Sequence, residues 1–514
     1  MTPDPVAPDP ATPSPASFAA LRDAVFSGRE PPPLQFVARL KSYRWFVVGT
    51  VCIGAFMGQV DASMTQMLLP RLERDFASTL SIVSWVAVAY ILTMASTMPI
   101  FGRLADMVGR KLLYTGAFLI FILGSALCGT AQDLPTLIAF RILQGVGAAL
   151  ITANSIAIVV LAVGPAERGR GLGLQSAAQA IGLGVGPAVG GLILDTLGWQ
   201  WAFWINVPFG VAGAILGWFV LPQTRHLQSG ERFDWGGALL IAPALTAIVA
   251  LLNQGHEWGV ASPLFIGCAV AAVVFLALFV WAERRAASPL IDFALLRQGA
   301  FVVGNLANFL SYAMLFGVFF LTPFVLVRVY QDTALVAGLR LSIVPVMLGV
   351  LAPVGGILYD RFGARAVTTS GMAICIAGLA VLYVFLNGTA ADMPLVMLGL
   401  AIFGIGQGFF ISPNSSAIMA TAPEKLTGEA GSLLNVVRYL GISTGIAGGS
   451  ALLAISIRAD AGAGASTVNA SAQVLVEASR NVILLLGAFG VLAAGLSLLR
   501  TVPRKPRGDD AVEL

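Results

Sequence analysis

Charged residues are scarce in this chain of 514 residues. Only 11% are Asp, Glu, Lys or Arg, less than half the roughly 25% of an average soluble domain, whereas 57% are hydrophobic. This balance excludes an ordinary water-soluble protein and predicts a polytopic membrane protein. The net charge of +4 gives no reason to expect nucleic acid as a partner, because basic residues at the inner loops of a membrane protein account for it.

Cysteine and histidine are also rare, with 4 and 2 copies. All the cysteines fall in apolar stretches, where packing as small hydrophobic residues is favoured over disulfides or metal ligation: Cys52, Cys128, Cys268 and Cys375. Because His226 and His256 have no ligand-like spacing, we expect no metal site. No nucleophile, base and orienting group cluster along the chain, so we expect neither an enzyme nor a cofactor.

Apolar stretches of about 20 residues, enough to cross a hydrocarbon core of about 30 Å, recur along the chain. Six lie near residues 45–69, 82–102, 112–130, 135–162, 170–194 and 201–221. Two more lie near 235–252 and 262–282, and six others near 300–327, 335–358, 367–387, 393–420, 429–457 and 480–500. The sequence therefore predicts an all-α protein with fourteen transmembrane helices, arranged as six, two and six.

The two groups of six spans share sequence patterns. GRLADMVGRK at 102–111 returns as GILYDRFGAR at 356–365, and ITANSIAI at 151–158 returns as ISPNSSAI at 411–418. Three glycines of the fifth span also return in the thirteenth: Gly182, Gly186 and Gly190 match Gly441, Gly445 and Gly449. Membrane carriers are commonly built from such repeats, with the substrate site between them. A parallel repeat of two six-helix bundles thus indicates a transporter.

Basic residues indicate the orientation. Most of the 30 lysines and arginines lie in tails and inner loops if the N-terminus is cytoplasmic, so both termini are predicted to be cytoplasmic. The expected organisation is a disordered Pro-rich tail, an N-terminal bundle, a linker with two inserted helices, a C-terminal bundle and a cytoplasmic tail, at 1–44, 45–221, 222–299, 300–500 and 501–514.

Charges inside the spans need an explanation, because each costs from about 2.5 kcal/mol upward at the bilayer centre. Asp61 is the carboxylate placed well inside a span, and it is the proton-site candidate because a carboxyl group in an alternately opening cavity can load and release a proton. The alternative is a polar group near the outer interface. Arg141 lies in the fourth span of one half only and is expected to act with Asp61; its alternative is a structural ion pair. Arg438 replaces Gln179 of the other half, and either contacts substrate or holds two helices together.

The repeated loop motif is interpreted as a cytoplasmic latch. Gly102 and Gly109 permit close backbone approach, Asp106 can meet a helix N-terminus or an arginine, and the next two basic residues are expected at the cytoplasmic surface: Arg110 and Lys111. A plain basic turn would not explain the second copy, which carries Asp360, Arg361 and Arg365. In the fifth span, close helix packing is the simplest reading of a glycine face with an adjacent proline, and a bend during transport is the alternative: Gly182, Gly186, Pro187, Gly190 and Gly191.

These segments resemble motifs of the fourteen-span drug:proton antiporters of the major facilitator superfamily. GRLADMVGRK matches the family's loop motif between the second and third spans, RILQGVGAA its fourth-span motif, and GLGVGPAVGG its fifth-span antiporter motif. WQWAFWINVP at 199–208 is similar to the segment entering the sixth span. Covering about residues 45–500, the resemblance implies two bundles plus an inserted helix pair working by alternating access.

The resemblance further implies a proton-driven exporter of small hydrophobic or amphipathic molecules, functional as a monomer in the lipid bilayer of a bacterial cytoplasmic membrane. The first span departs from the family pattern, since Ser63 stands where Thr is expected and Gln66 where Asn is expected. No acid occurs between Leu335 and Leu358, where relatives that export cationic drugs can carry one, so a preference for dications is disfavoured.

Polar residues of the spans are the candidates for lining the cavity: Gln59, Gln66, Tyr90, Gln144, Asn154, Gln175, Asn305, Asn308, Tyr312, Gln407, Asn414, Asn435 and Arg438. Many of them can instead bond neighbouring helices. Two alternatives to drug export stay open. One is export of an endogenous metabolite, siderophore or lipid-like molecule, and the other is a non-transporting scaffold or sensor that uses the Pro-rich tail.

Overall fold

The computed structural model describes residues 30, 32–164, 167–224, 235–259, 261–286, 293–423, 426–462 and 465–500. Within these ranges every regular element is a helix: α2 (Gln35–Ala38), α3 (Tyr43–Asp75), α4 (Leu80–Val108), α5 (Arg110–Cys128), α6 (Leu134–Val163), α7 (Arg168–Thr196), α8 (Gln200–Trp204), α9 (Asn206–Val220), α10 (Trp235–Trp258), α11 (Pro263–Glu283), α12 (Phe293–Leu296), α13 (Gly299–Arg328), α14 (Ala334–Leu341), α15 (Ile343–Phe385), the 3₁₀ turn η2 (Ala390–Asp392), α16 (Met393–Thr421), α17 (Thr427–Ala461) and α18 (Ala472–Leu499).

Twelve helical segments of the described chain are long and apolar enough to cross a membrane. The sequence predicts fourteen, and the difference arises at two places. The tenth and eleventh expected spans form one run, Ala334–Phe385, interrupted inside α15 by Gly363, whose φ of 80° and ψ of 167° are not helical. The seventh expected span is α10, whose apolar part is the shorter helix Leu239–Gly255.

Glycine turns mark the same point of the repeated motif in both halves. Gly109, with a φ of 119°, separates α4 from α5, and Gly363 separates the two parts of α15. A side chain is strained at positive φ, whereas glycine adopts it readily. Each copy of the motif therefore uses its second glycine to turn the chain between two helices.

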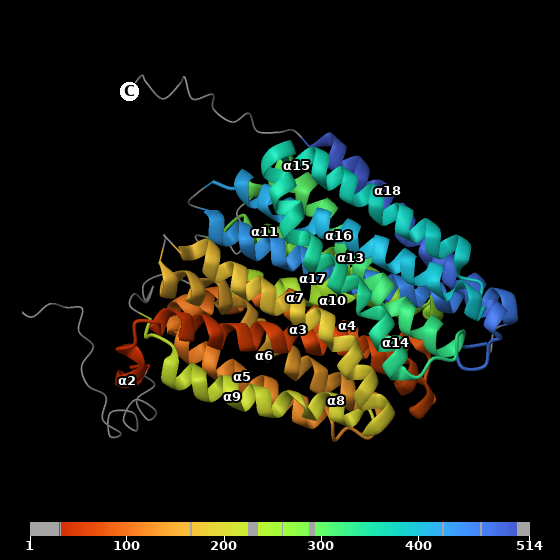
Figure 1. Ribbon diagram of the computed structural model, residues 1–514, viewed down its shortest axis with the longest axis horizontal. Helices are drawn as coiled ribbons and strands as arrows, with labels where there is room; N and C mark the ends of the chain where they lie inside the picture. Colours follow the sequence, from red (N-terminus) through yellow and green to blue (C-terminus); the bar gives the residue numbers. More distant parts are fainter. Residues whose placement is uncertain are drawn as a thin grey trace, which may run out of the picture.

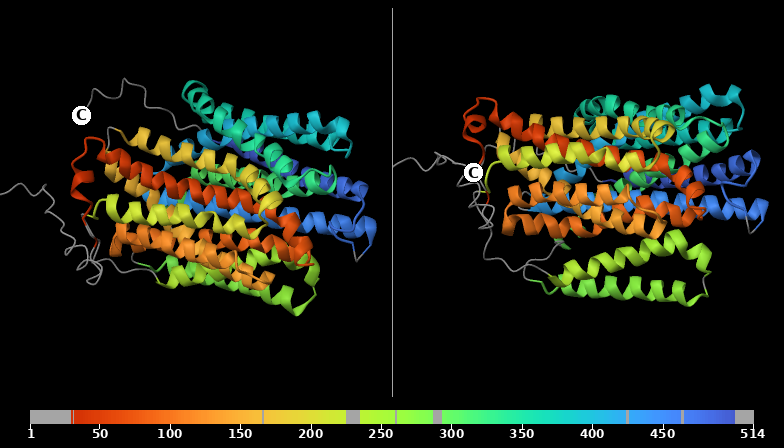
Figure 2. Two further views of the ribbon diagram at one scale, coloured as in Figure 1. Left: turned by 60° about the horizontal axis from the view of Figure 1, so that its bottom comes forward. Right: turned by 90° about the horizontal axis from the view of Figure 1, so that it is seen from below.

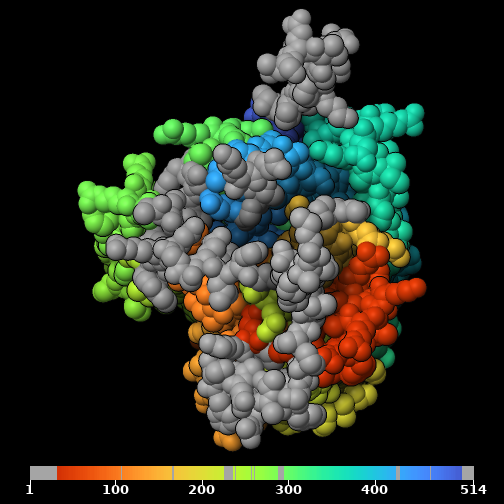
Figure 3. All heavy atoms as spheres, turned by 90° about the vertical axis from the view of Figure 1, so that its left-hand side faces the viewer, coloured from red at the N-terminus to blue at the C-terminus, as the bar shows by residue number. Residues whose placement is uncertain are grey.

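The helices form two bundles that lie side by side (Figure 1). α3 to α9 make up the N-terminal half and α13 to α18 the C-terminal half, and α2 and the C-terminal end of α18 lie toward the same end of the molecule. Figure 3 views the molecule from that end, with the N-terminal half (red to yellow) below and the C-terminal half (teal to blue) above. Contacts of α4 with α17, and of α7 with α14 and α15, form the seam between the halves.

The inserted helices α10 and α11 stand at one edge of the molecule (Figure 2). α10 contacts α4 and α17, whereas α11 packs mainly on α10. The side chain of Asn253 in α10 donates to the carbonyl of Ser81 at 3.1 Å and accepts from the hydroxyl of Ser84 at 3.1 Å. The pair is therefore attached at the seam, beside the two bundles and outside both.

The prediction that residues 1–44 are disordered is wrong for the described part of that segment. Residues 35–38 form α2, Leu34 N donates to Phe219 O at 2.9 Å, and the Tyr43 hydroxyl donates to Val220 O at 2.9 Å. Residues 1–29 and 31, like the expected tail at 501–514, lie outside the described residues. The docked part of the segment therefore belongs to the N-terminal half.

Candidate functional site

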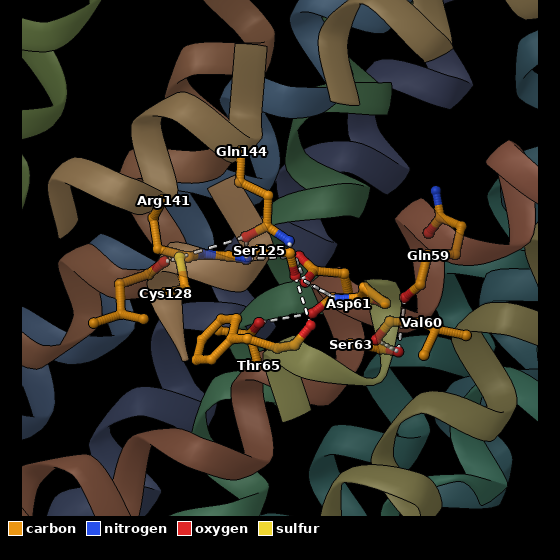
Figure 4. Close-up of polar contacts among 12 residues, drawn as sticks. Gln59, Val60, Asp61, Ser63, Thr65, Ser125, Cys128, Arg141 and Gln144 are labelled. Carbon is orange, nitrogen blue, oxygen red and sulfur yellow. Dashed lines mark hydrogen bonds and ion pairs between the residues drawn. The ribbon is translucent and has the colours of Figure 1, made fainter. Parts of the chain in front are cut away.

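An aspartate and an arginine from different helices form a buried ion pair in the N-terminal half (Figure 4). Asp61 lies in α3, and Arg141 lies in α6. Arg141 Nη1 is 2.7 Å from Asp61 Oδ2, and the two side chains are 1% and 0% exposed, respectively. The structure thus brings together the two charges that the sequence singles out, within hydrogen-bonding distance and away from solvent.

Neutral polar groups complete the surroundings of Asp61. Its Oδ1 accepts from Gln144 Nε2 at 2.9 Å and from Asn206 Nδ2 at 3.0 Å. The same two amide groups donate to the hydroxyl of Ser125, at 3.1 and 3.2 Å, and this hydroxyl donates to Phe203 O at 2.7 Å. Arg141 also donates to Gln144 Oε1 at 2.6 Å. The carboxylate therefore sits in a network drawn from α3, α5, α6 and α9.

Two glycines allow α5 and α6 to approach closely enough for this network. A Cβ atom at Gly124 would lie 2.5 Å from the backbone nitrogen of Gln144, and one at Gly147 would lie 2.5 Å from that of Phe121. This close packing holds Gln144 and Ser125 within hydrogen-bonding distance. Without it, buried polar groups would be left unpaired, at a cost of about 1–3 kcal/mol each.

Tyr90 of α4 connects the ion pair to the interior space between the two halves. Its ring centroid is 4.1 Å from the guanidinium carbon of Arg141, a cation–π distance. The same side chain lines a central cavity, together with Gln59 of α3, Gln179 of α7 and Tyr439 of α17. One aromatic ring therefore touches both the buried cation and the cavity.

The central cavity is small in this conformation. Its volume is about 30 Å³, whereas pockets that hold drug-sized ligands measure roughly 300–1,000 Å³. Residues of both halves line it, including Thr152 and Phe316. Binding a molecule larger than a few water molecules therefore requires the halves to separate.

Of the other predicted cavity residues, most bond within their own half. Gln144 belongs to the Asp61 network. Three donate to a carbonyl of their own helix: Asn154, Asn305 and Asn435. Two bond to a neighbouring helix of the C-terminal half: Gln407 and Asn414. Four are buried with an amide atom that has no partner among the described residues: Gln66, Gln175, Asn305 and Asn308.

The loop motif between α4 and α5 is covered by the N-terminal segment. Glu30 Oε1 accepts from the backbone nitrogens of Lys111 at 3.0 Å and Leu112 at 3.3 Å, and from the Thr224 hydroxyl at 2.9 Å. The expectation that Lys111 faces the cytoplasmic surface is wrong, because it is only 1% exposed. The carboxylate of Glu30 thus caps the N-terminus of α5, where unpaired N–H groups favour an anion.

The two copies of this motif differ in their surroundings. In the second copy, Asp360, Arg361 and Arg365 are exposed, and Arg361 lies over the ring of Phe362 at 5.3 Å. A Cβ atom added at Gly102 of the first copy would meet open space among the described residues. The side chain of Asp106, on which the latch prediction depends, lies outside the described part of the chain.

The glycine face of α7 packs directly on α3. A Cβ atom at Gly182 would lie 2.5 Å from Phe56 O, one at Gly186 would lie 2.9 Å from Val60 O, and one at Gly190 would lie 2.7 Å from Met64 Cγ. The other side of α7 packs as closely on α14: a Cβ at Gly191 would collide with Ala334 O, and one at Gly338 with Pro187 O. Close packing thus extends across the seam.

Polar contacts also join the halves at the end opposite α2. Asp195 of α7 accepts from the backbone nitrogens of Ala334 at 3.2 Å and Leu335 at 2.8 Å. Arg328 of α13 donates to Pro70 O at 2.8 Å and lies 3.7 Å from the carboxylate of Glu73 in α3. The hydroxyl of Thr467 also donates to Glu73. This end of the seam is closed in the described conformation.

Sequence reasoning misses several residues of these contacts. Asn206 lies in the WINVP segment quoted above, so a signal for it exists, whereas Ser125 is an ordinary small residue of an apolar helix. Glu73 follows the apolar part of the first expected span, so the sequence suggests an interfacial charge there. Glu30 lies among prolines. Their partners come from distant parts of the chain.

Comparisons with known proteins agree on one family. A model of the Major Facilitator Superfamily matches residues 51–446 and, in a second match, 304–513. The riboflavin transporter RibZ of Clostridioides difficile is 35% identical over 419 residues, covering 80% of this chain and 89% of the relative. A multidrug resistance protein B homolog of Mycobacterium tuberculosis is 31% identical over 411 residues, covering 79% and 75%. The inward-facing, unoccupied structure of a bacterial homolog of the lysosomal transporter Spinster shares the fold, with a TM-score of 0.62, 14% identity and 90% and 97% coverage.

Proposed function

Because the chain belongs to the Major Facilitator Superfamily, we propose that it is a proton-coupled antiporter that exports small hydrophobic or amphipathic molecules by alternating access. The observation that carries the proposal is the ion pair of Asp61 and Arg141, fully buried in one half. A buried pair of charges is expensive to maintain unless it has a role or excellent geometry. The carboxyl group of this pair, linked to the cavity through Tyr90, can supply the coupling by taking up and releasing a proton.

Protonation of Asp61 would change the network in a defined way. The neutral acid no longer balances Arg141, whose remaining neighbours are polar groups and the rings of Tyr90 and Phe203. Movement of the guanidinium then displaces Tyr90, which lines the cavity. One proton crossing a potential of about 100 mV supplies about 2.3 kcal/mol, enough to drive accumulation of a neutral substrate by more than ten-fold.

We also propose fourteen spans with both termini cytoplasmic. Gly363 divides α15 into two helices, and α10 stands beside α4 and α17 as a further membrane helix. The excess of Lys and Arg in loops at the α2 end supports a cytoplasmic location of that end. In this orientation the closed end of the seam is the outer one, and the bacterial cytoplasmic membrane is the expected location.

A second candidate is transport of an endogenous metabolite. The specific observation in its favour is the 35% identity to a relative named as a riboflavin transporter, beside relatives named for multidrug resistance. A siderophore or lipid-like cargo is a variant of the same idea. A non-transporting scaffold or sensor has less support, because it gives no role to the buried pair of charges.

Reconstituted liposomes test the proposal. We would load them with a pH-sensitive dye, impose a proton gradient, and add riboflavin or ethidium as probes. Wild-type protein is expected to move protons only when a transported probe is present, and Asp61→Asn is expected to move none. Glu477→Gln, which changes an exposed acid in α18, is the matched control. Probe-dependent proton movement by Asp61→Asn at the wild-type rate would remove Asp61 from the coupling role.

A further inference from the structure

A second arginine lies within a membrane-spanning helix beside the cavity, and it has no carboxylate partner among the described residues. The guanidinium carbon of Arg438 in α17 is 5.4 Å from the ring centroid of Tyr312 and 5.0 Å from that of Tyr439. Its Nη2 is 3.5 Å from the Tyr439 hydroxyl, and its Nε has no hydrogen-bond partner in the part of the chain that the structure describes. Arg141, by contrast, is matched by Asp61.

The position of Arg438 places it at the edge of the cavity. Tyr439, the next residue, lines the cavity, and so does Phe316, which lies one turn after Tyr312 on the same face of α13. Both Arg438 and Tyr312 come earlier in helices that begin at the α2 end of the molecule. Arg438 therefore lies on the α2 side of Tyr439, which is the side from which a molecule would enter if the halves separate at that end.

The charge balance of the cavity favours one class of molecule. Its lining among the described residues contains small, aliphatic, amide, hydroxyl and aromatic side chains and no charged one. Arg438, next to the lining residue Tyr439, is therefore a cation beside an uncharged cavity. The tyrosine rings stabilise the guanidinium by cation–π contact, but they leave its donors without an anion. Arg can form two parallel hydrogen bonds with a carboxylate, and the Nε of Arg438 has no partner among the described residues.

We propose that Arg438 is the substrate-recognition cation of this transporter, and that it selects planar aromatic molecules carrying a carboxylate or a comparable anionic group. Tyr312 and Tyr439 provide flat faces for the aromatic part. The inference deepens the function proposed above and rests on it. The competing explanation is structural: Arg438 joins α13 to α17 through the two tyrosines, and then the charge of a ligand would not matter to it.

A matched pair of probes separates these explanations. We would measure equilibrium binding of 2-naphthoate and 2-naphthylmethylammonium to purified protein in neutral detergent, since the two share one ring system and carry opposite charges. Wild-type protein is expected to bind the carboxylate at least about ten-fold more tightly than the ammonium, as for one charge-assisted hydrogen bond. Arg438→Gln is expected to lose this preference. Arg480→Gln, at an exposed ion pair of α18, should keep it.

A charge transposition guards against an effect of folding alone. Gln179 is the counterpart of Arg438 in the other half and lines the cavity. The double variant Gln179→Arg, Arg438→Gln moves the cation to the opposite wall and is expected to restore the preference for naphthoate. Arg438→Lys should retain the preference with weaker binding. If Arg438→Gln does not fold, Arg438→Lys decides the matter, because unchanged naphthoate binding in that variant would overturn recognition by the guanidinium.

Several results would overturn the proposal: binding of neither probe, equal binding of both, a preference for the ammonium, or an unchanged preference in Arg438→Gln. Binding in detergent needs no transport, so the outcome is independent of proton coupling. A protein that shows the charge preference but no probe-dependent proton movement would refute the antiporter function and leave the recognition by Arg438 intact. Coupled transport without the charge preference would refute the recognition by Arg438 and leave the antiporter function intact.

Discussion

Neutralising Asp61 is the most informative perturbation of this molecule, because it separates the stability of the buried network from its role in coupling. In Asp61→Asn, Arg141 keeps its charge inside the bundle, where its side chain is 1% exposed. Asparagine also presents a single oxygen, so it cannot accept from Arg141, Gln144 and Asn206 as the carboxylate does. The variant should therefore be less stable as well as uncoupled.

The expected loss can be estimated from the structure. Removing one partner of a buried ion pair costs about 3–5 kcal/mol, whereas replacing both partners by well-packed hydrophobic residues of similar volume is often neutral or stabilising, because no uncompensated charge remains. We therefore expect Asp61→Asn to lose about 3–5 kcal/mol of unfolding free energy. The double variant Asp61→Asn, Arg141→Gln should recover most of that loss. Proton-coupled transport should be absent from both variants, since neither carries the titratable group.

Unfolding in mixed micelles, followed by circular dichroism, measures the stability of the wild type, Asp61→Asn, Arg141→Gln and the double variant, which together form a double-mutant cycle. The liposome assay described above measures coupling in the same preparations. A double variant no more stable than Asp61→Asn would show that uncompensated charge is not the cause of the loss. Uphill, pH-driven export by the double variant would show that another group carries the proton.

Three further variants test the packing, the closed end of the seam and the cap on α5. Gly186→Ala should lower the unfolding free energy by about 1–3 kcal/mol, through overpacking against α3, whereas Gly184→Ala meets only ordinary contacts at 3.8 Å or more. Glu73→Gln weakens the contact with Arg328 and should increase spin-label distances between the halves at the closed end. Glu30→Ala removes the cap and should accelerate hydrogen exchange at the start of α5 roughly 2- to 30-fold.

For each of these variants, one result would contradict the prediction. Equal stability of Gly186→Ala and Gly184→Ala would mean that α7 can shift away from α3 without cost. Glu477→Gln is the exposed control for Glu73→Gln. Unchanged spin-label distances between the halves in Glu73→Gln would mean that the packing of α14 holds the closed end. Unchanged exchange in Glu30→Ala would mean that solvent caps α5 equally well.

The sequence predicts the helices well because hydropathy is a local property. It indicates Asp61 and Arg141 for a similar reason: charges in apolar spans are rare enough to stand out. Their pairing depends on how α3 and α6 pack, which no spacing along the chain reveals. Ser125 and Asn206 complete the network but are uncharged, and small polar residues in membrane helices are too common to attract notice.

Other errors have equally physical causes. The helix count differs at two places: the single-residue turn at Gly363 leaves two expected spans in one described run, and the apolar part of α10 is only Leu239–Gly255. Lysine is normally solvated, which is why Lys111 is expected at the surface. Its burial depends on Glu30, which arrives from a Pro-rich segment with no local signal of docking. The latch prediction for Asp106 stays a prediction.

The cap on α5 has a practical consequence for measuring motion. Through Glu30, the first described residues, the start of α5 and the exit from α9 at Thr224 share one set of hydrogen bonds. Three chain segments that hydropathy would treat as separate loops thus form one fixed corner of the N-terminal half. A fluorophore or spin label attached there will report the rotation of the whole half, without a contribution from independent loop motion. It offers a reference point against which the other half can be tracked.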